Sequence, residues 1–333
     1  MNEIRTIGIV GSGKMGGDLF NYLSDFNFRL IWYTRSEDHK EALIKTYHKK
    51  LKRQLKHGII SQEVFDIRYS YQITTQIEEL ADCDLIIESI IEDPEIKQNL
   101  FASLDKLTKP SCILSSNSSS IIPSDLLETG RKNRILGLHF FYPIAFNNTV
   151  EVIASEETDE ITIEKAKLFL NEIKRFFMLQ NEESAFLLNR FLLQLQVIAF
   201  NLLKEYNLGY RQLDSVAKNL VPEFGMFEMM DHVGHYTMYN AIRNYSKMDP
   251  EKLKYEPLLQ ELLNRKSSSN GNKSHLFYAS NMQNEDLSEQ TEKYILAKLN
   301  DAAIHFLTLY TDQYDINVYS FKKALQEYCG IVL

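Results

Sequence analysis

A glycine-rich turn near the start of the chain, Gly11-Ser12-Gly13-Lys14-Met15-Gly16, restricts the possible folds more than any other stretch. It follows an apolar run at 4–10 and precedes 17–23, which has the pattern of a helix. A strand, a glycine turn and a helix in that order are typical of a dinucleotide site. The first glycine permits the turn, the second lets the backbone approach a pyrophosphate, and the third lets the helix pack close to the strand. The N–H groups and dipole at the start of the helix then hold the anion. The sequence predicts a nucleotide site here, with an ordinary glycine turn as the alternative.

Composition narrows the class of protein. At 333 residues the chain is long enough for about two domains. A net charge of −8 argues against nucleic-acid binding, and no apolar run is long enough to span a bilayer. No signal-peptide pattern precedes the first strand. Cys83, Cys112 and Cys329 form neither a disulfide framework nor a metal-ligand spacing. We expect a cytoplasmic protein with reduced thiols, no membrane partner and no metal.

The end of the second predicted strand, 28–33, bears on the choice of cofactor. A carboxylate is usual about 20 residues after the glycines, where it binds the adenosine ribose. This chain has Thr34 there, followed by Arg35. An arginine suits a 2′-phosphate, so NADP stands beside NAD as an option. Alternatively, Glu37 or Asp38 takes over the carboxylate's role, or water and backbone hold the ribose.

Residues 39–57 are predicted to form a basic amphipathic helix. The stretch holds seven lysine and arginine residues against one acid, and its apolar residues recur at helical spacing. In an acidic chain such a helix suits a polyanionic ligand tail, such as the phosphates of coenzyme A. The alternative is a solvated helix face.

Polar residues follow two further predicted strands. The run at 84–93 ends in acids, and Glu92 and Lys97 are expected to face the cofactor crevice, because ligands bind beyond the carboxyl ends of parallel strands. The strand at 112–114 leads into a serine cluster at 115–120, which suits hydrogen bonding to a ligand. The alternative for the serines is a loop that caps a helix.

Two ionisable residues interrupt the next apolar runs. His139 lies in 135–143 and Glu151 in 149–153, and the short connection lets the two strands lie side by side. A histidine facing a glutamate makes a general-base pair, in which the carboxylate orients the ring and stabilises the imidazolium. The alternative is a histidine satisfied within the core.

The alternation of strands and helices stops near residue 185, and helix follows helix from there. The predicted fold is an α/β Rossmann-type doubly wound sheet followed by an all-α C-terminal domain. We place the nucleotide-binding domain at 1–185, a helical substrate and dimerisation domain at 186–280, and a helical extension at 281–333.

The chain resembles the L-3-hydroxyacyl-CoA dehydrogenase family of fatty-acid metabolism. The likeness is carried in family order by five blocks: Gly11-Ser12-Gly13-Lys14-Met15-Gly16 for G-x-G-x-M-G; Glu88-Ser89-Ile90-Ile91-Glu92 with Lys97 and Leu100-Phe101 for E-x-[IV]-x-E and K-x-x-L-F; Ser116-Asn117-Ser118-Ser119-Ser120 for S-N-T-S-S; Gly137-Leu138-His139-Phe140-Phe141 with Glu151-Val152-Ile153 for G-L-H-F-F and E-V-I; and Leu188-Asn189-Arg190 for V-N-R.

The resemblance implies a role for each matching residue. His139 would take the proton of the 3-hydroxyl, and Glu151 would hold and polarise the His139 ring. Hydride would pass from C3 to the nicotinamide. Ser119 would form a hydrogen bond with the reacting oxygen. Asn189, which belongs to the second domain, would bind the substrate carbonyl. The resemblance further implies that three residues line the cofactor or its join with the substrate, and that the basic helix binds the CoA tail. Those three residues are Glu92, Lys97 and Asn117.

Departures from the family pattern leave alternatives open. Tyr142 replaces an asparagine, and the segments at 222–227 and 271–278 differ from the family's near the expected acyl site. The substrate could therefore be a 3-hydroxy acid without CoA or a carrier-protein thioester. A catalytically silent nucleotide-binding protein is the alternative of another class.

The extension at 281–333 looks like a truncated repeat of the helical domain at an offset of 104 residues, as in multifunctional fatty-oxidation chains, with coincidence between amphipathic helices as the alternative. The expected assembly is a homodimer, or a monomer if the extension covers the dimer surface.

Overall fold

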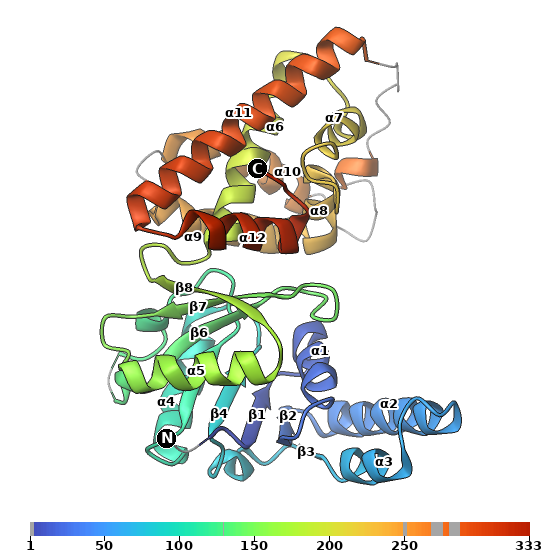
Figure 1. Ribbon diagram of the computed structural model, residues 1–333, viewed down its shortest axis with the longest axis vertical. Helices are drawn as coiled ribbons and strands as arrows, with labels where there is room; N and C mark the ends of the chain where they lie inside the picture. The colour runs from blue at the N-terminus through green and yellow to red at the C-terminus, as the bar shows by residue number, and fades with distance from the viewer. Residues whose placement is uncertain (1–2, 129, 249–251, 268–275, 280–286) are drawn as a thin grey trace. The chain divides into compact units, whose positions relative to one another are not determined.

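A computed structural model describes residues 3–128, 130–248, 252–267, 276–279 and 287–333 (Figure 1). The chain divides into two compact units, Met1–Ala185 and Phe186–Leu333, and each is treated by itself. The boundary expected at 280 and 281, and residues 271–275 of the altered family segment, lie outside the described residues.

The first unit is built on one eight-stranded sheet in the order β3-β2-β1-β4-β5-β6-β7-β8. Neighbouring strands are parallel except for the antiparallel pair β6 and β7. The strands are β1 (Thr6–Val10), β2 (Arg29–Tyr33), β3 (Gln72–Thr74), β4 (Leu85–Glu88), β5 (Ile113–Ser116), β6 (Ile135–Phe140), β7 (Thr149–Ala154) and β8 (Phe176–Asn181).

Helices cover both faces of this sheet because side chains alternate along each strand. Ile7 and Ile9 of β1 join a core cluster with α1 and α5, whereas Val10 joins a second cluster with α4 on the other face. The helices of this unit are α1 (Lys14–Leu23), α2 (Glu37–Lys56), α3 (Gln62–Tyr69), α4 (Pro94–Leu107) and α5 (Glu160–Glu172). The predicted doubly wound Rossmann-type fold is confirmed.

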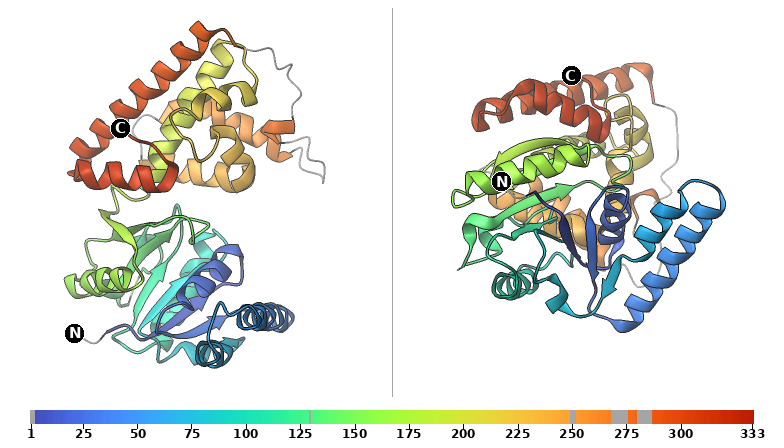
Figure 2. Two further views of the ribbon diagram at one scale, coloured as in Figure 1. Left: turned by 45° about the vertical axis from the view of Figure 1, so that its right-hand side comes forward. Right: turned by 60° about the horizontal axis from the view of Figure 1, so that its bottom comes forward.

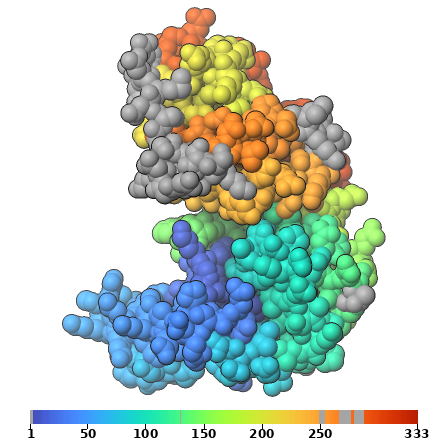
Figure 3. Space-filling view, turned by 180° about the vertical axis from the view of Figure 1, so that it is seen from behind, coloured from blue at the N-terminus to red at the C-terminus, as the bar shows by residue number. Residues whose placement is uncertain are grey.

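The predicted basic helix is α2. It lies side by side with α3 (Figure 2), and the pair projects from the first unit (Figure 3). Tyr47 and Leu51 anchor it in the core, while most of its other residues are exposed or half-buried. Ser36 begins the helix by accepting a hydrogen bond from the backbone N–H of His39.

Two predicted strands differ in length from those observed. The run expected at 84–93 pairs only as far as Glu88, because the buried Glu88 carboxylate accepts the N–H of Ile90 and turns the chain out of the sheet. Conversely, β5 continues into Ser115 and Ser116, where Ser115 Oγ bonds the carbonyl of Ile86 in β4. Side-chain hydrogen bonds, which apolar patterning does not reveal, decide both ends.

Among its described residues, the second unit contains helices and no strand. Fourteen of the nineteen residues of α6 are buried, which makes it the central helix of this unit. Helix α11 packs along it (Figure 1). The helices are α6 (Leu187–Glu205), α7 (Tyr210–Ala217), α8 (Met226–Val233), α9 (His235–Met248), α10 (Glu256–Ser267), α11 (Glu289–Tyr314) and α12 (Val318–Cys329). None of the helices in the described ranges is long and apolar enough to cross a membrane.

The glycine turn joins β1 to α1 in the expected way. Gly11 has φ +124°, a region that favours glycine. A Cβ on Gly16 would lie 2.1 Å from the carbonyl oxygen of Gly11, so helix and turn touch through bare backbone. Trp32 Nε1 donates to that same oxygen at 2.7 Å and ties the turn to β2.

We expect Gly16→Ala to lower the free energy of unfolding by about 1–3 kcal/mol, because the added methyl group has no room against rigid backbone. Urea unfolding followed by circular dichroism measures the change. Gly17→Ala is the control, since its Cβ would meet only Trp32 at 3.5 Å. Equal stability of the two variants would contradict the close-packing argument.

Candidate active site

The carboxyl ends of β1, β4 and β5 carry the glycine turn, the acids and the serines at one edge of the sheet. Gly13 is the N-cap of α1, with an extended backbone and no capping side chain. A Cβ built on it meets nothing within 4 Å among the described residues. The first turn of α1 therefore presents N–H groups without an intrahelical partner, as an anion site requires. Lys14 is exposed here, and Ser12 and Met15 are half-buried.

Thr34 occupies the place of the usual ribose-binding carboxylate. It is buried at the end of β2, and its hydroxyl donates to Ser12 Oγ at 3.0 Å. Arg35 beside it is exposed. Glu37 accepts a hydrogen bond from Thr75 and pairs with Lys40, so its carboxylate is engaged within the protein.

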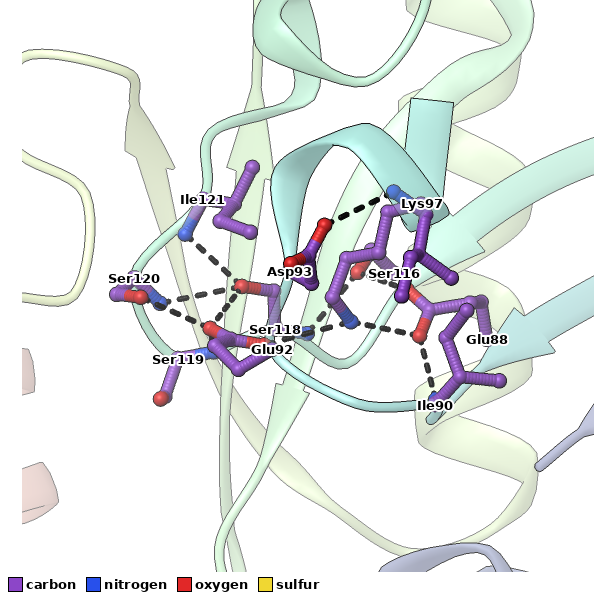
Figure 4. Close-up of polar contacts among 11 residues, drawn as sticks. Glu88, Ile90, Glu92, Asp93, Lys97, Ser116, Ser118, Ser119, Ser120 and Ile121 are labelled. Atoms are coloured by element: carbon purple, nitrogen blue, oxygen red, sulfur yellow. Dashed lines mark hydrogen bonds and ion pairs between the residues drawn. The ribbon is translucent and has the colours of Figure 1, made fainter. Parts of the chain in front are cut away.

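A buried ion cluster connects β4 with α4. Lys97 is 1% exposed, and its Nζ lies 2.6 Å from Glu88 Oε1 and 3.3 Å from Glu92 Oε2 (Figure 4). Ser116 Oγ donates to the other Glu88 oxygen at 2.6 Å. The ammonium of Lys97 is thus enclosed between two carboxylates, and its role in lining the cofactor site stays a prediction.

The serine loop is organised by Glu92. Its Oε1 accepts hydrogen bonds from Ser118 Oγ at 2.5 Å, from Ser120 Oγ at 2.8 Å and from the Ser119 N–H at 3.2 Å. The Ser119 side chain points away from this cluster (Figure 4). Asn117 Oδ1 accepts the N–H of Phe140 at 2.8 Å, which fixes the loop beside the end of β6. The serines thus place Ser119 rather than merely capping a helix.

The charge on Glu92 is stabilised by this arrangement. Burial by itself would raise the pKa of the carboxyl group, but the Lys97 ammonium and the hydroxyls of Ser118 and Ser120 outweigh it. The pKa of Glu92 therefore lies below its ordinary value, and the loop is held by a carboxylate.

His139 and Glu151 face each other across the antiparallel strands β6 and β7. His139 Nδ1 lies 2.8 Å from Glu151 Oε2, and both side chains are buried. Gln180 of β8 donates from Nε2 to the second oxygen, Oε1, at 2.9 Å. With Nδ1–H given to the carboxylate, Nε2 is the basic nitrogen of a neutral ring. The three side chains form a line across three strands that can hold and stabilise a proton on His139.

Asn189 belongs to the second unit, in the first turn of α6. It is half-buried between buried neighbours. Its Nδ2 donates to the hydroxyl of Tyr245 at 3.2 Å, and its Oδ1 accepts from Tyr328 at the same distance.

Among the described residues, no group of three or more His, Cys, Asp or Glu side chains is placed to hold a metal ion.

Comparison with protein families decides the assignment. Models of the NAD-binding domain and of the C-terminal domain of 3-hydroxyacyl-CoA dehydrogenase match residues 6–182 and 186–279. The chain belongs to this family. The predicted family, the oxidoreductase activity and NAD as the cofactor are thereby confirmed. The open glycine turn at the start of α1 fits that cofactor.

Individual relatives agree with the family. A 3-hydroxybutyryl-CoA dehydrogenase from Bradyrhizobium diazoefficiens is 29% identical over 234 residues, covering 69% of this chain and 80% of the relative. The structure of (S)-3-hydroxybutyryl-CoA dehydrogenase from Ralstonia eutropha matches with a TM-score of 0.70 at 24% identity. The match covers 79% of this chain and 94% of the Ralstonia chain. The structure of the dehydrogenase part of multifunctional enzyme 1 from C. elegans matches with a TM-score of 0.56 at 21% identity. The match covers all of this chain and 79% of the C. elegans chain. The last two show a shared fold.

Two residues of the site are missing from the sequence prediction of it. Glu88 is one: it is fully buried, and its Oε1 makes the shorter of the two ion pairs of Lys97. Gln180 is the other: the apolar run at 176–179 stops before it, whereas β8 runs to Asn181 and brings Gln180 beside Glu151. A glutamine in a strand next to that of Glu151 was the available signal.

We expect the stability difference between wild type and Glu92→Gln to be largest near pH 6 and to shrink towards pH 3. The folded pKa of Glu92 lies below its ordinary value of 4.5, so ionisation stabilises the folded state above that pH. This contribution is lost as the pH falls through the folded pKa. Urea unfolding at four pH values measures it, with Glu95→Gln, at an exposed position in the first turn of α4, as control. A difference that does not vary with pH would refute this role of the charge.

Proposed function

We propose that the chain oxidises the 3-hydroxyl group of a 3-hydroxyacyl-CoA, or reduces the corresponding ketone, with His139 as the general acid and base. The observation that carries this is the buried pair of His139 and Glu151 at 2.8 Å. The bond from Phe140 N–H to Asn117 adds support, because it fixes the loop of Ser119 next to the strand of His139.

The proposed chemistry follows from these groups. In the oxidation direction His139 Nε2 takes the hydroxyl proton, and Glu151 stabilises the imidazolium through Nδ1–H. Ser119 hydrogen-bonds the reacting oxygen as the C3–O bond becomes a carbonyl, and Asn189 contacts the substrate carbonyl. NAD, held at the glycine turn of α1, would supply the acceptor for the hydride of C3. In reduction the same proton returns from His139 to the oxygen.

The CoA assignment is supported by α2. This helix presents an exposed basic face suited to the phosphates of a CoA tail. Tyr142, which replaces a family asparagine, is 57% exposed, and we propose that it affects the choice of acyl group. A substrate without CoA would leave the basic face of α2 without a ligand.

Compartment and assembly are further parts of the proposal. All three cysteines are free and buried, and burial raises the pKa of the Cys83 and Cys329 thiols to about 12 and of Cys112 to about 11. Protonated, reduced thiols suit the cytoplasm.

Because α11 and α12 pack on α6 within one chain, we propose a monomer over the homodimer expected from the family. Sedimentation equilibrium tests this assembly.

The activity is tested by following absorbance at the nicotinamide band with acetoacetyl-CoA, in parallel with NADH and NADPH. We expect oxidation of NADH. Removing the base in His139→Gln should lower kcat by ~100-fold or more, since positioned acid–base groups contribute about that much. Retained NADH binding without turnover in the wild type would overturn the proposed activity, and a near wild-type rate in the variant would overturn the assigned base.

Gln180→Met is expected to lower kcat roughly 3- to 10-fold, the effect of one lost hydrogen bond, because Glu151 loses the donor that fixes its second oxygen. The melting temperature should also fall, because the buried Glu151 carboxylate loses a donor, and removal of the buried Gln180 Oε1, which has no hydrogen-bond partner in the described part of the chain, offsets only part of that loss. Steady-state kinetics and thermal denaturation measure both. Leu179→Met, at a 44% exposed position, is the control. An unchanged kcat would argue against this role for Gln180.

A further inference from the structure

Asn189 is held by two phenols from two different helices, α9 and α12. Tyr245 of α9 is buried and accepts a hydrogen bond from Asn189 Nδ2, while Tyr328 of α12 donates its O–H to Asn189 Oδ1. Each distance is 3.2 Å. The amide oxygen and the amide nitrogen of Asn189 thus have separate partners, supplied by separate helices.

Tyr328 lies outside the region that defines the family. The C-terminal family model ends at residue 279, and α12 spans Val318–Cys329. Its contact with Asn189 reaches back across 139 residues of sequence. A residue of the extension therefore touches a side chain for which substrate contact is proposed.

The contact belongs to a wider pattern along α6. Arg190 Nη2 donates to Tyr314 at 2.6 Å, and Gln194 Nε2 donates to Tyr310 at 3.0 Å. Arg190 and Gln194 are 4% and 2% exposed, so they depend on partners inside the protein. Three tyrosines of α11 and α12 thus meet three successive polar side chains of the central helix, which makes the extension part of the unit's core.

We propose that Tyr328 is a positioning residue, which fixes the orientation of the Asn189 amide and so completes the substrate site from the C-terminal extension. The proposal rests on the proposed function of Asn189. An amide turned by 180° would present its oxygen, an acceptor, where a donor is needed for a substrate carbonyl. In the observed arrangement the Tyr328 O–H donates to Oδ1, which leaves the amide nitrogen of Asn189 to act as the donor. The amide nitrogen carries two N–H groups, so one serves the substrate while the other bonds Tyr245.

Tyr328→Phe tests the proposal, because it removes only the hydroxyl and keeps the ring that lies 6.2 Å from the ring of Phe224. We expect kcat/KM for acetoacetyl-CoA to fall roughly 3- to 10-fold, as for one hydrogen bond. The Kd of NADH and the melting temperature should not change. Tyr319→Phe is the matched control, on the same helix but 76% exposed, and should behave as wild type.

The double variant separates positioning from packing. If Tyr328 acts through Asn189, Tyr328→Phe should have no further effect on kcat/KM in an Asn189→Ala background. An equal loss in both backgrounds, or no loss in the single variant, would overturn the proposal while leaving the proposed activity intact. Wild-type kcat/KM in Asn189→Ala alone would instead remove the proposed substrate contact of Asn189, and the role of Tyr328 with it.

Discussion

The ammonium group of Lys97, enclosed between Glu88 and Glu92, is the interaction on which the rest of the site depends. A buried ion pair adds little net stability, because desolvation offsets most of the attraction, yet removing one partner costs about 3–5 kcal/mol. Its value here is geometric. It ties the end of β4 to α4 and holds Glu92 in its ionised form, and Glu92 in turn orders the loop that presents Ser119. The need to pair the buried charge of Lys97 thereby sets the position of Ser119 at the edge of the sheet.

The antiparallel strand β7 contributes the second constraint. In a parallel neighbour His139 and Glu151 would be related by a slanted ladder, whereas the antiparallel register puts them directly opposite each other. The cross-strand distance then suits a histidine and a carboxylate. Gln180 extends the line to β8, even though its buried carbonyl oxygen has no hydrogen-bond partner among the described residues. An apolar side chain would avoid that cost, so the amide nitrogen is best understood as serving Glu151.

Much of this could be predicted from the sequence, for identifiable reasons. Apolar runs, the glycine turn and the start of α4 at Pro94 are local signals, and they locate the strands, the doubly wound sheet and the facing of His139 and Glu151. What could not be predicted depends on contacts between distant residues. The enclosure of Lys97 requires Glu88 and Ser116 to meet across two strands, and apolar periodicity does not encode where a buried carboxylate ends a strand. The contact between Asn189 and Tyr328 spans 139 residues and has no local pattern at all.

The polar side chains of α6 explain why the extension matters to the family fold. A central helix buried on all sides would normally be apolar, yet α6 carries Asn189, Arg190 and Gln194 in two turns. Tyrosine suits such partners, because its ring fills the core while its hydroxyl bonds an amide or guanidinium group. Tyr310, Tyr314 and Tyr328 thus each bond a polar group of α6 from helices that lie beyond the family's C-terminal domain. Two of these bonds stabilise the core, whereas the third, at the N-terminal end of α6, acts on a residue with a proposed role in the reaction.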